Sequence, residues 1–236
     1  MEDQTSSPEL LLFLASTVHD MKNSVSVVSG TLESLLAAPA AGEGDSSHGQ
    51  LALMLYESKR MNDKLIQLLA LYKQVGKPGY PFDVEPQMVG QLIEQVVSQE
   101  KILLASRNIA LETACPADLI REYDEDLLIG VLGNAINNAI RYTRDTIRLS
   151  AAEVDGWLEL RVEDNGDGFT PAMIAAGADA MASNTTGVNF STNSTGLGLY
   201  FSSVVAQMHK HRGRRGSIAL ENGGALGGGS FIVRLP

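Results

Sequence analysis

The amino-acid sequence predicts an α+β protein, in which an antiparallel helical hairpin is followed by an α/β sandwich. Residues 1–75 carry apolar side chains at the three-and-four spacing of helices that pack on other helices. Residues 84–236 interleave helical patterns with short strand-like runs, which is typical of one sheet covered by helices. Between them, residues 76–83 contain two glycines and two prolines and are predicted to be a linker.

Two helices are expected in the first region. Their apolar seams run from Leu11 to Leu35 and from Leu51 to Val75, and Ser58 is the one polar seam residue. The loop between them is rich in alanine, glycine and serine. A lone hairpin leaves much of its seam exposed, so we expect two copies to form a dimeric four-helix bundle, that is, a homodimer. The alternative is that the hairpin packs on the rest of its own chain.

The second region contains three helical patterns and five strand-like runs. Helical spacing covers residues 84–106 and 124–142, and an apolar helix is expected at 199–208. The strand-like runs are residues 109–113, 146–152, 157–163, 217–221 and 230–235.

Composition and charge exclude several classes of function. The chain has 236 residues with a net charge of −10, so binding along a nucleic-acid backbone is not expected. Cys115 is the single cysteine, which excludes an intramolecular disulfide and fits a reducing cytoplasm. The apolar run at 10–15 is too short for a membrane span. If Met1 is the native start, we therefore expect a soluble, cytoplasmic protein.

Three short strings carry the chemistry of the second region: NAINNAIRYT at 134–143, DNGDG at 164–168 and STGLGL at 194–199. In the first, Asn134, Asn138 and Arg141 follow one another at steps of four and three and share a helix face. Amide oxygens bind hard cations such as Mg²⁺, and an arginine pairs with phosphate. A solvated polar face is the alternative explanation.

The two glycine strings suit a nucleotide. Asp164 ends a strand-like run before a glycine turn, where a carboxylate can accept a hydrogen bond from an adenine amino group. The string STGLGL opens a helix, and the N-terminus of that helix can hold phosphate. Taken singly, DNGDG is also explained as a plain turn, and STGLGL is also explained by helix capping through Ser194 or Thr195. Together, the three strings predict a pocket for a nucleotide and its metal.

The three strings occur in this order and are followed by the final GGGSFIVRLP. Together they resemble the catalytic ATP-binding domain of sensor histidine kinases. That domain belongs to a wider family shared with Hsp90, gyrase and MutL. The resemblance covers about residues 84–236 and implies ATP and Mg²⁺ as cofactors. It implies that Asn138 is the principal Mg²⁺ ligand, that Asn134 supports it, and that Asp164 binds adenine. The other residues that it implies for cofactor binding are Arg141, Tyr142, Gly166, Gly168, Thr195, Gly196, Leu197 and Gly198. Ser194 stands where the family has a glycine, and residues 180–193 lack its clear phenylalanine box.

The first helix contains HDMKN at 19–23, which resembles the H-box of the dimerisation and phosphotransfer domain of these kinases. The resemblance implies that His19 accepts the phosphoryl group. Asp20 would accept a proton or orient the ring, and Asn23 would position a water. A lone histidine is more often a solvated side chain, and we expect that explanation for His209 and His211 in HKHRGRRG. Contact of these two histidines with phosphate or with a partner is the alternative.

The sequence thus predicts an ATP-dependent protein-histidine kinase of a two-component system. It would autophosphorylate and pass the phosphoryl group to an aspartate on the receiver domain of a separate response regulator, with dephosphorylation of that partner as a further activity. One alternative is a histidine phosphotransferase whose degenerate nucleotide domain serves as a docking surface. Another is an ATPase clamp of the same superfamily. The stimulus is expected from a separate sensory protein, an upstream region or the short termini.

Overall fold

The computed structural model describes residues 21, 24–36, 50–59, 61, 65, 82–182 and 196–236. The chain divides into two compact units, Met1–Pro81 and Phe82–Pro236. Residues 1–20, 66–81 and 183–195 are outside the described part, and so are the predicted phosphotransfer residues His19, Asp20 and Asn23. In the described part, no helix combines the length and the apolar character that crossing a membrane requires.

Among the described residues of the first unit, helical stretches lie at residues 24–36 and 50–59. Ser58, the polar seam residue, lies with its Oγ 2.9 Å from the Oγ of Ser29 and donates to the carbonyl oxygen of Val25 at 3.4 Å. Lys59 pairs with Glu33 at 3.1 Å. The two stretches therefore contact each other, and the polar seam residue has its partner on the opposite helix.

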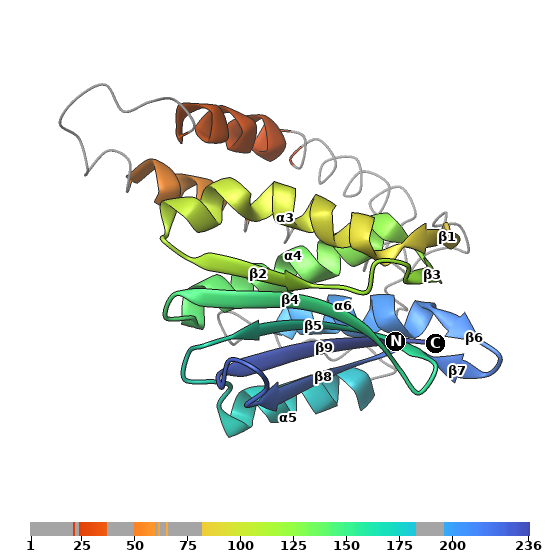
Figure 1. The fold of residues 1–236 in the computed structure, drawn as a ribbon. Coiled ribbons are helices and arrows are strands. Elements are labelled where there is room, and N and C mark those ends of the chain that lie inside the picture. Colours follow the sequence, from red (N-terminus) through yellow and green to blue (C-terminus); the bar gives the residue numbers. More distant parts are fainter. Residues whose placement is uncertain are drawn as a thin grey trace, which may run out of the picture. The chain divides into compact units, whose positions relative to one another are not determined.

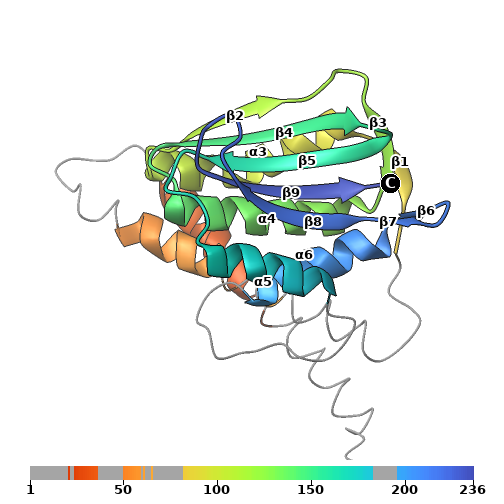
Figure 2. The ribbon, with the colours of Figure 1, turned by 90° about the horizontal axis from the view of Figure 1, so that it is seen from below.

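The second unit contains a five-stranded mixed sheet, with α4, α5 and α6 side by side on one face (Figures 1 and 2). Only the pair β2–β4 is parallel among the neighbouring strands of this sheet. The strands, in sheet order, are β2 (Ala110–Ala114), β4 (Thr146–Val154), β5 (Trp157–Asp164), β9 (Gly229–Leu235) and β8 (Ser217–Asn222). The helices are α3 (Val89–Ser106), α4 (Glu125–Tyr142), α5 (Pro171–Ala182) and α6 (Gly196–Met208).

The two faces of the sheet differ in polarity. Alternate residues of each strand share a face of the sheet, and those on the face toward the helices are mainly apolar. Leu160 of β5, for example, pairs with Val233 of β9, and both are fully buried. On the other face, the Glu159 carboxylate binds Arg161 and Arg234. Burial raises the pKa of Glu159, but the two guanidinium groups outweigh it and hold that pKa below its ordinary value.

A tight turn joins the two longest strands. Asp155 and Gly156 connect β4 to β5, with φ of 52° and 75°. Both angles are in the left-handed region that a two-residue hairpin turn of type I′ requires, and Asp-Gly is a preferred sequence for it. This turn fixes the register in which Val154 pairs with Trp157.

All five predicted strands of the sheet are present, and the α+β class is confirmed for this unit. The predicted helical start at residue 84 is wrong. Residues Glu85–Met88 form β1, which pairs with β3 (Ile120–Tyr123), and the helix begins at Val89. Pro86 contributes to the difference, because the residue before a proline, here Glu85, is disfavoured in the helical region and favoured in an extended conformation. The small hairpin of β6 (Lys210–His211) and β7 (Arg214–Arg215) and the helix α5 were not predicted.

Candidate functional site

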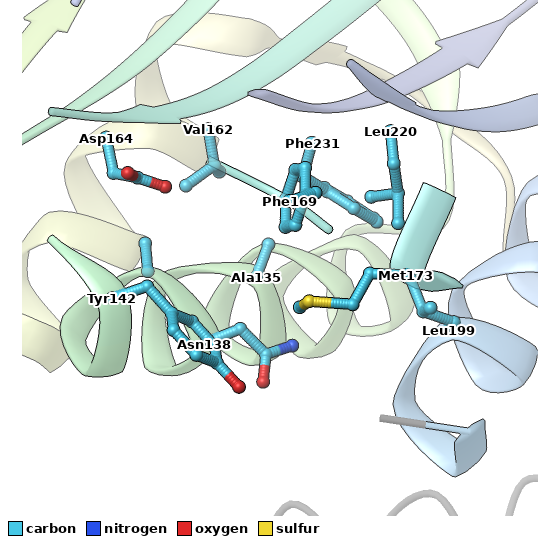
Figure 3. Close-up of a pocket in the computed structure, with 11 residues that line it drawn as sticks. Ala135, Asn138, Tyr142, Val162, Asp164, Phe169, Met173, Leu199, Leu220 and Phe231 are labelled. Carbon is cyan, nitrogen blue, oxygen red and sulfur yellow. The ribbon is translucent and has the colours of Figure 1, made fainter. Parts of the chain in front are cut away.

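A cavity of about 500 Å³, counted to its open mouth, is lined by residues of β5, β8, β9, α4, α5 and α6 (Figure 3). Most of its wall is apolar. Figure 3 shows the carboxylate of Asp164 on the sheet side and the side chains of Asn138 and Tyr142 on α4. An apolar cavity with a few polar groups is the usual form of a small-molecule site. The lining residues are Ala135, Asn138, Ala139, Tyr142, Val162, Asp164, Phe169, Met173, Leu199, Leu220 and Phe231.

Asp164 is the charged group of this wall, and it is only 5% exposed. Its Oδ1 accepts hydrogen bonds from the backbone N–H groups of Gly166 at 2.8 Å and Gly229 at 3.3 Å. Within the described residues, Oδ2 receives no hydrogen bond. One oxygen thus fixes the carboxylate, and the other is left to accept a hydrogen bond from a ligand.

Glycines around Asp164 let backbone segments approach one another. A Cβ on Gly166 would collide with the carbonyl oxygen of Tyr142, and one on Gly228 would collide with the carbonyl oxygen of Asp164. Gly228 also donates its N–H to that oxygen at 3.0 Å. Sequence reasoning did not assign Gly228 and Gly229 to the site, although both belong to the glycine run that precedes the last strand.

Gly168 acts in the turn after Asp164. Its φ is +80°, and a Cβ there would lie 2.7 Å from Oδ1 of Asn222. That oxygen accepts from the N–H of Phe169 at 2.7 Å, and the amide of Asn222 donates to the Phe169 carbonyl at 2.9 Å. Gly168 therefore leaves room for the Asn222 side chain, whose two hydrogen bonds hold Phe169 at the cavity.

Helix α4 presents three predicted residues on one face. Asn138 and Tyr142 line the cavity, and Asn134 meets the second glycine string, because a Cβ on Gly198 would lie 2.7 Å from its Nδ2. Arg141 is exposed and lies over the ring of Tyr142, 5.7 Å from its centroid. The first and third sequence strings thus meet at Asn134.

Asn165 was missed by sequence reasoning and ties the end of α4 to the DNGDG turn. Its Oδ1 accepts from the Thr143 hydroxyl at 2.9 Å and from the backbone N–H of Arg144 at 3.1 Å. Its amide donates to Asp145 at 2.7 Å. Hydrogen bonds from Thr146 and Asn165 lower the pKa of Asp145. An asparagine before glycine was the available signal.

The family described as histidine kinase-, DNA gyrase B- and HSP90-like ATPase matches residues 123–236. The sensor protein SrrB of Staphylococcus aureus strain NCTC 8325 / PS 47 is 26% identical over 227 residues, which are 95% of this chain and 37% of SrrB. SrrB of strain MRSA252 gives the same identity and coverage. The second unit contains a sensor histidine kinase ATP-binding domain. The whole chain spans 37% of the length of these curated relatives.

Solved structures agree on the fold of this ATP-binding domain. The nucleotide-free catalytic domain of the histidine kinase ThkA has a TM-score of 0.54 at 22% identity and covers 65% of this chain and 97% of its own. Full-length ShkA in complex with AMPPNP has a TM-score of 0.57 at 21% identity and covers 94% of this chain and 45% of its own.

The donor set on the cavity wall fits Mg²⁺. In the described part of the ATP-binding domain, no group of three or more His, Cys, Asp or Glu side chains could hold a metal ion. Mg²⁺ does not need such a group, because it usually keeps waters and binds through one or two protein oxygens and substrate phosphates. The amide of Asn138 on the cavity wall offers one oxygen of this type.

The structure brings six of the predicted site residues together around or beside the cavity. They are Asn134, Asn138, Tyr142, Asp164, Gly166 and Gly198. Gly196 and Leu197 begin α6, and Thr195 lies outside the described residues.

The two histidines of HKHRGRRG differ in exposure. His211 is exposed, as expected. The prediction that His209 is solvated is wrong, since His209 is 4% exposed.

Proposed function

We propose that this chain is an ATP-dependent protein-histidine kinase of a two-component system. The cavity binds ATP, His19 accepts the γ-phosphoryl group, and an aspartate on a separate response-regulator receiver domain receives it next. Two observations support the proposal. The similarity to sensor proteins extends over 95% of the chain, beyond the ATP-binding domain. The cavity combines an apolar wall with the polar groups that ATP needs.

The arrangement of Asp164 carries the ATP assignment. Its Oδ1 is held by two backbone N–H groups, and its Oδ2 is left to accept from an amino group. An adenine amino group is a donor of this kind, and Val162, Phe169 and Phe231 provide the apolar surface for its ring. On α4, Asn138 would hold Mg²⁺, which would neutralise charge on the phosphates.

Phosphoryl transfer then requires a nucleophile from the first unit. A neutral imidazole nitrogen of His19 attacks the γ-phosphorus, the bond from that phosphorus to the bridging oxygen breaks, and ADP leaves. Asp20 takes up or shares the proton of the other ring nitrogen. In reactions of this type, positioning and charge stabilisation supply most of the rate. Asn23 would hold a water for dephosphorylation of the regulator.

A homodimer belongs to this proposal. In the first unit, the seam residues Val28 and Met54 are 52% and 59% exposed, and the seam residue Leu35 is 51% exposed. A second copy of the hairpin would cover such side chains in a four-helix bundle. Each protomer would then present its own His19.

Incubation of the chain with γ-labelled ATP tests the proposal. We expect an acid-labile label on the protein that is lost in His19→Ala and retained in His48→Ala, the matched control from the same unit. Label retained in His19→Ala would exclude His19 as the acceptor.

Two further outcomes assign the alternatives. If AMPPNP does not bind the wild-type chain with or without Mg²⁺, the chain is a phosphotransferase whose nucleotide domain is degenerate. If ATP turnover is steady and unaffected by His19→Ala, the chain acts as an ATPase clamp.

A further inference from the structure

His209 is a buried histidine that the proposed reaction does not use. It directly follows α6, and its Nε2 lies 3.0 Å from the backbone N of Asp124, the N-cap residue of α4. Its Nδ1 lies 2.8 Å from the carbonyl oxygen of Val205. An N–H only donates and a carbonyl only accepts, so Nδ1 carries the proton and Nε2 accepts. The ring is therefore neutral, in one tautomer, and links α6 to α4.

The surroundings of His209 favour this neutral form. Burial lowers its pKa, while the hydrogen bond to the Val205 carbonyl and the charge of Asp124 raise it; burial outweighs both. Protonation would place an N–H of the ring against the N–H of Asp124. The link between α4 and α6 thus exists only with the uncharged ring.

Asp124 extends the link to the start of the second unit. Its Oδ1 accepts from the N–H of Leu127 at 3.0 Å, which caps α4, and its Oδ2 accepts from the N–H of Asp83 at 3.1 Å. The ring of Phe82 packs edge-on against His209, with centroids 4.9 Å apart. One buried junction therefore joins the beginning of α4, the end of α6 and the first residues of the unit.

The same two helices meet again at the cavity. They run antiparallel, because the beginning of α4 lies at the end of α6 and Asn134 lies against Gly198 near the beginning of α6. Asn134 follows Asp124 by ten residues, roughly 15 Å along a helix. Between these points, the ring of Phe201 lies 3.5 Å from where a Cβ on Gly130 would be. If the outer link is lost, α4 can shift against α6 at the cavity.

We propose that His209 is a positioning residue for nucleotide binding. Its hydrogen bond with Asp124 fixes α4 against α6, and so fixes the amide of Asn134 against Gly198 and the position of Asn138 on the cavity wall. The inference rests on the proposed ATP-binding role of the cavity. His209 itself touches no nucleotide and acts through α4.

Two amide substitutions in the full chain separate this role from simple packing. In His209→Gln, the side-chain oxygen can reach the Asp124 N–H. In His209→Asn, the side chain is too short to reach it but can still donate to the Val205 carbonyl. For Mg²⁺·AMPPNP, we expect binding by the Gln variant within about twofold of wild type and binding by the Asn variant about tenfold weaker. The KM for ATP should rise in the same proportion in the Asn variant, and kcat should change less.

His211→Gln, in the exposed hairpin two residues away, is the matched control and should bind as wild type does. Equal loss in the Gln and Asn variants, in proportion to unfolded protein measured by circular dichroism, would reduce His209 to a packing residue. Undiminished binding by a folded Asn variant would also overturn the inference. Failure of wild-type chain to bind AMPPNP would instead overturn the proposed function, so the two failures are distinguishable.

Discussion

The two ends of the α4–α6 pair use polar groups in opposite ways. At the end formed by Asp124 and His209, each side chain is 4% exposed and hydrogen-bonded within the protein. At the other end, Asn138 and Tyr142 line an open cavity, and Tyr142 is 40% exposed. Buried and fully paired groups specify one arrangement of the backbone, whereas polar groups on a cavity wall remain available to a ligand. The comparison distinguishes residues that fix the backbone around the site from residues whose polar groups face the cavity.

Asp164→Asn should give the largest effect, because Asp164 holds the turn and, in the proposed function, also binds adenine. If the new amide turns its oxygen toward the N–H groups of Gly166 and Gly229, its NH₂ faces the ligand and opposes an adenine amino group. We expect AMPPNP affinity to fall by up to about 100-fold, as for loss of a hydrogen bond to a charged group. Isothermal titration calorimetry measures it.

Asp167→Asn is the control for that substitution. Asp167 belongs to the same DNGDG turn, but its side chain is 96% exposed and its partner, Arg144, is also largely exposed. An exposed ion pair contributes little, so affinity should not change. Equal losses in the two variants would mean that the charge of the turn matters rather than the oxygen on the cavity wall.

Gly198→Ala tests the contact between the helices at the cavity. The new Cβ would lie 2.7 Å from Nδ2 of Asn134, so α4 or the amide must move. We expect a loss of about 1–3 kcal/mol in the free energy of unfolding, typical of overpacking, together with weaker AMPPNP binding. Urea denaturation and calorimetry measure the two quantities.

Gly90→Ala in α3 is the matched substitution, because nothing lies within 4 Å of its Cβ position. There the free energy of unfolding should rise, but by less than the roughly 0.5–1 kcal/mol typical of a glycine in the middle of a helix, because Gly90 is the second residue of α3. If Gly198→Ala behaves in the same way, Asn134 does not depend on this close approach.

The smallest effect concerns the dependence of stability on pH. The folded state lowers the pKa of His209 below its ordinary value of 6.5, so the unfolded chain binds the proton more readily. The contribution of His209 to stability is therefore complete above pH 6.5 and decreases as the pH falls through 6.5 toward the lower folded-state pKa. In His209→Gln this contribution is absent, so the free energy of unfolding should fall less between about pH 7.5 and about pH 5 than in wild type. Equal slopes would contradict the neutral ring.

The sequence predicted those parts of the fold and site that depend on near neighbours. Strand alternation located the five strands of the sheet. Helical spacing predicted that Asn134, Asn138 and Arg141 share one helix face. Asn138 lines the cavity beside Tyr142, which the resemblance had implied, whereas Arg141 is exposed. The glycines after Asp164 were recognised because a tight turn requires them locally. In each case, the residues that decide the conformation are within a few positions of one another.

The rest depended on contacts between distant residues. His209 looked solvated because the residues that follow it are charged and exposed, but its partner Asp124 is 85 positions away. Gly228 and Gly229 were recognised only as part of the final GGGSFIVRLP, and their place against Asp164 is known only from the structure. The strand β1 is four residues long and has no alternating pattern, so only its pairing with β3 identifies it.

The order of strands in the sheet also governs when the site can form during folding. The hairpin of β4 and β5 closes through a two-residue turn, so it can form early. The strand β9 pairs with β5 through residues far apart in the chain, such as Leu235 and Leu158, so this pairing closes a long loop and forms more slowly. Asp164 obtains the Gly229 N–H, and the cavity its Phe231 wall, only when β9 is in place. A nucleotide therefore finds no complete site in a partly folded chain, and its binding energy stabilises the finished domain rather than guiding its assembly.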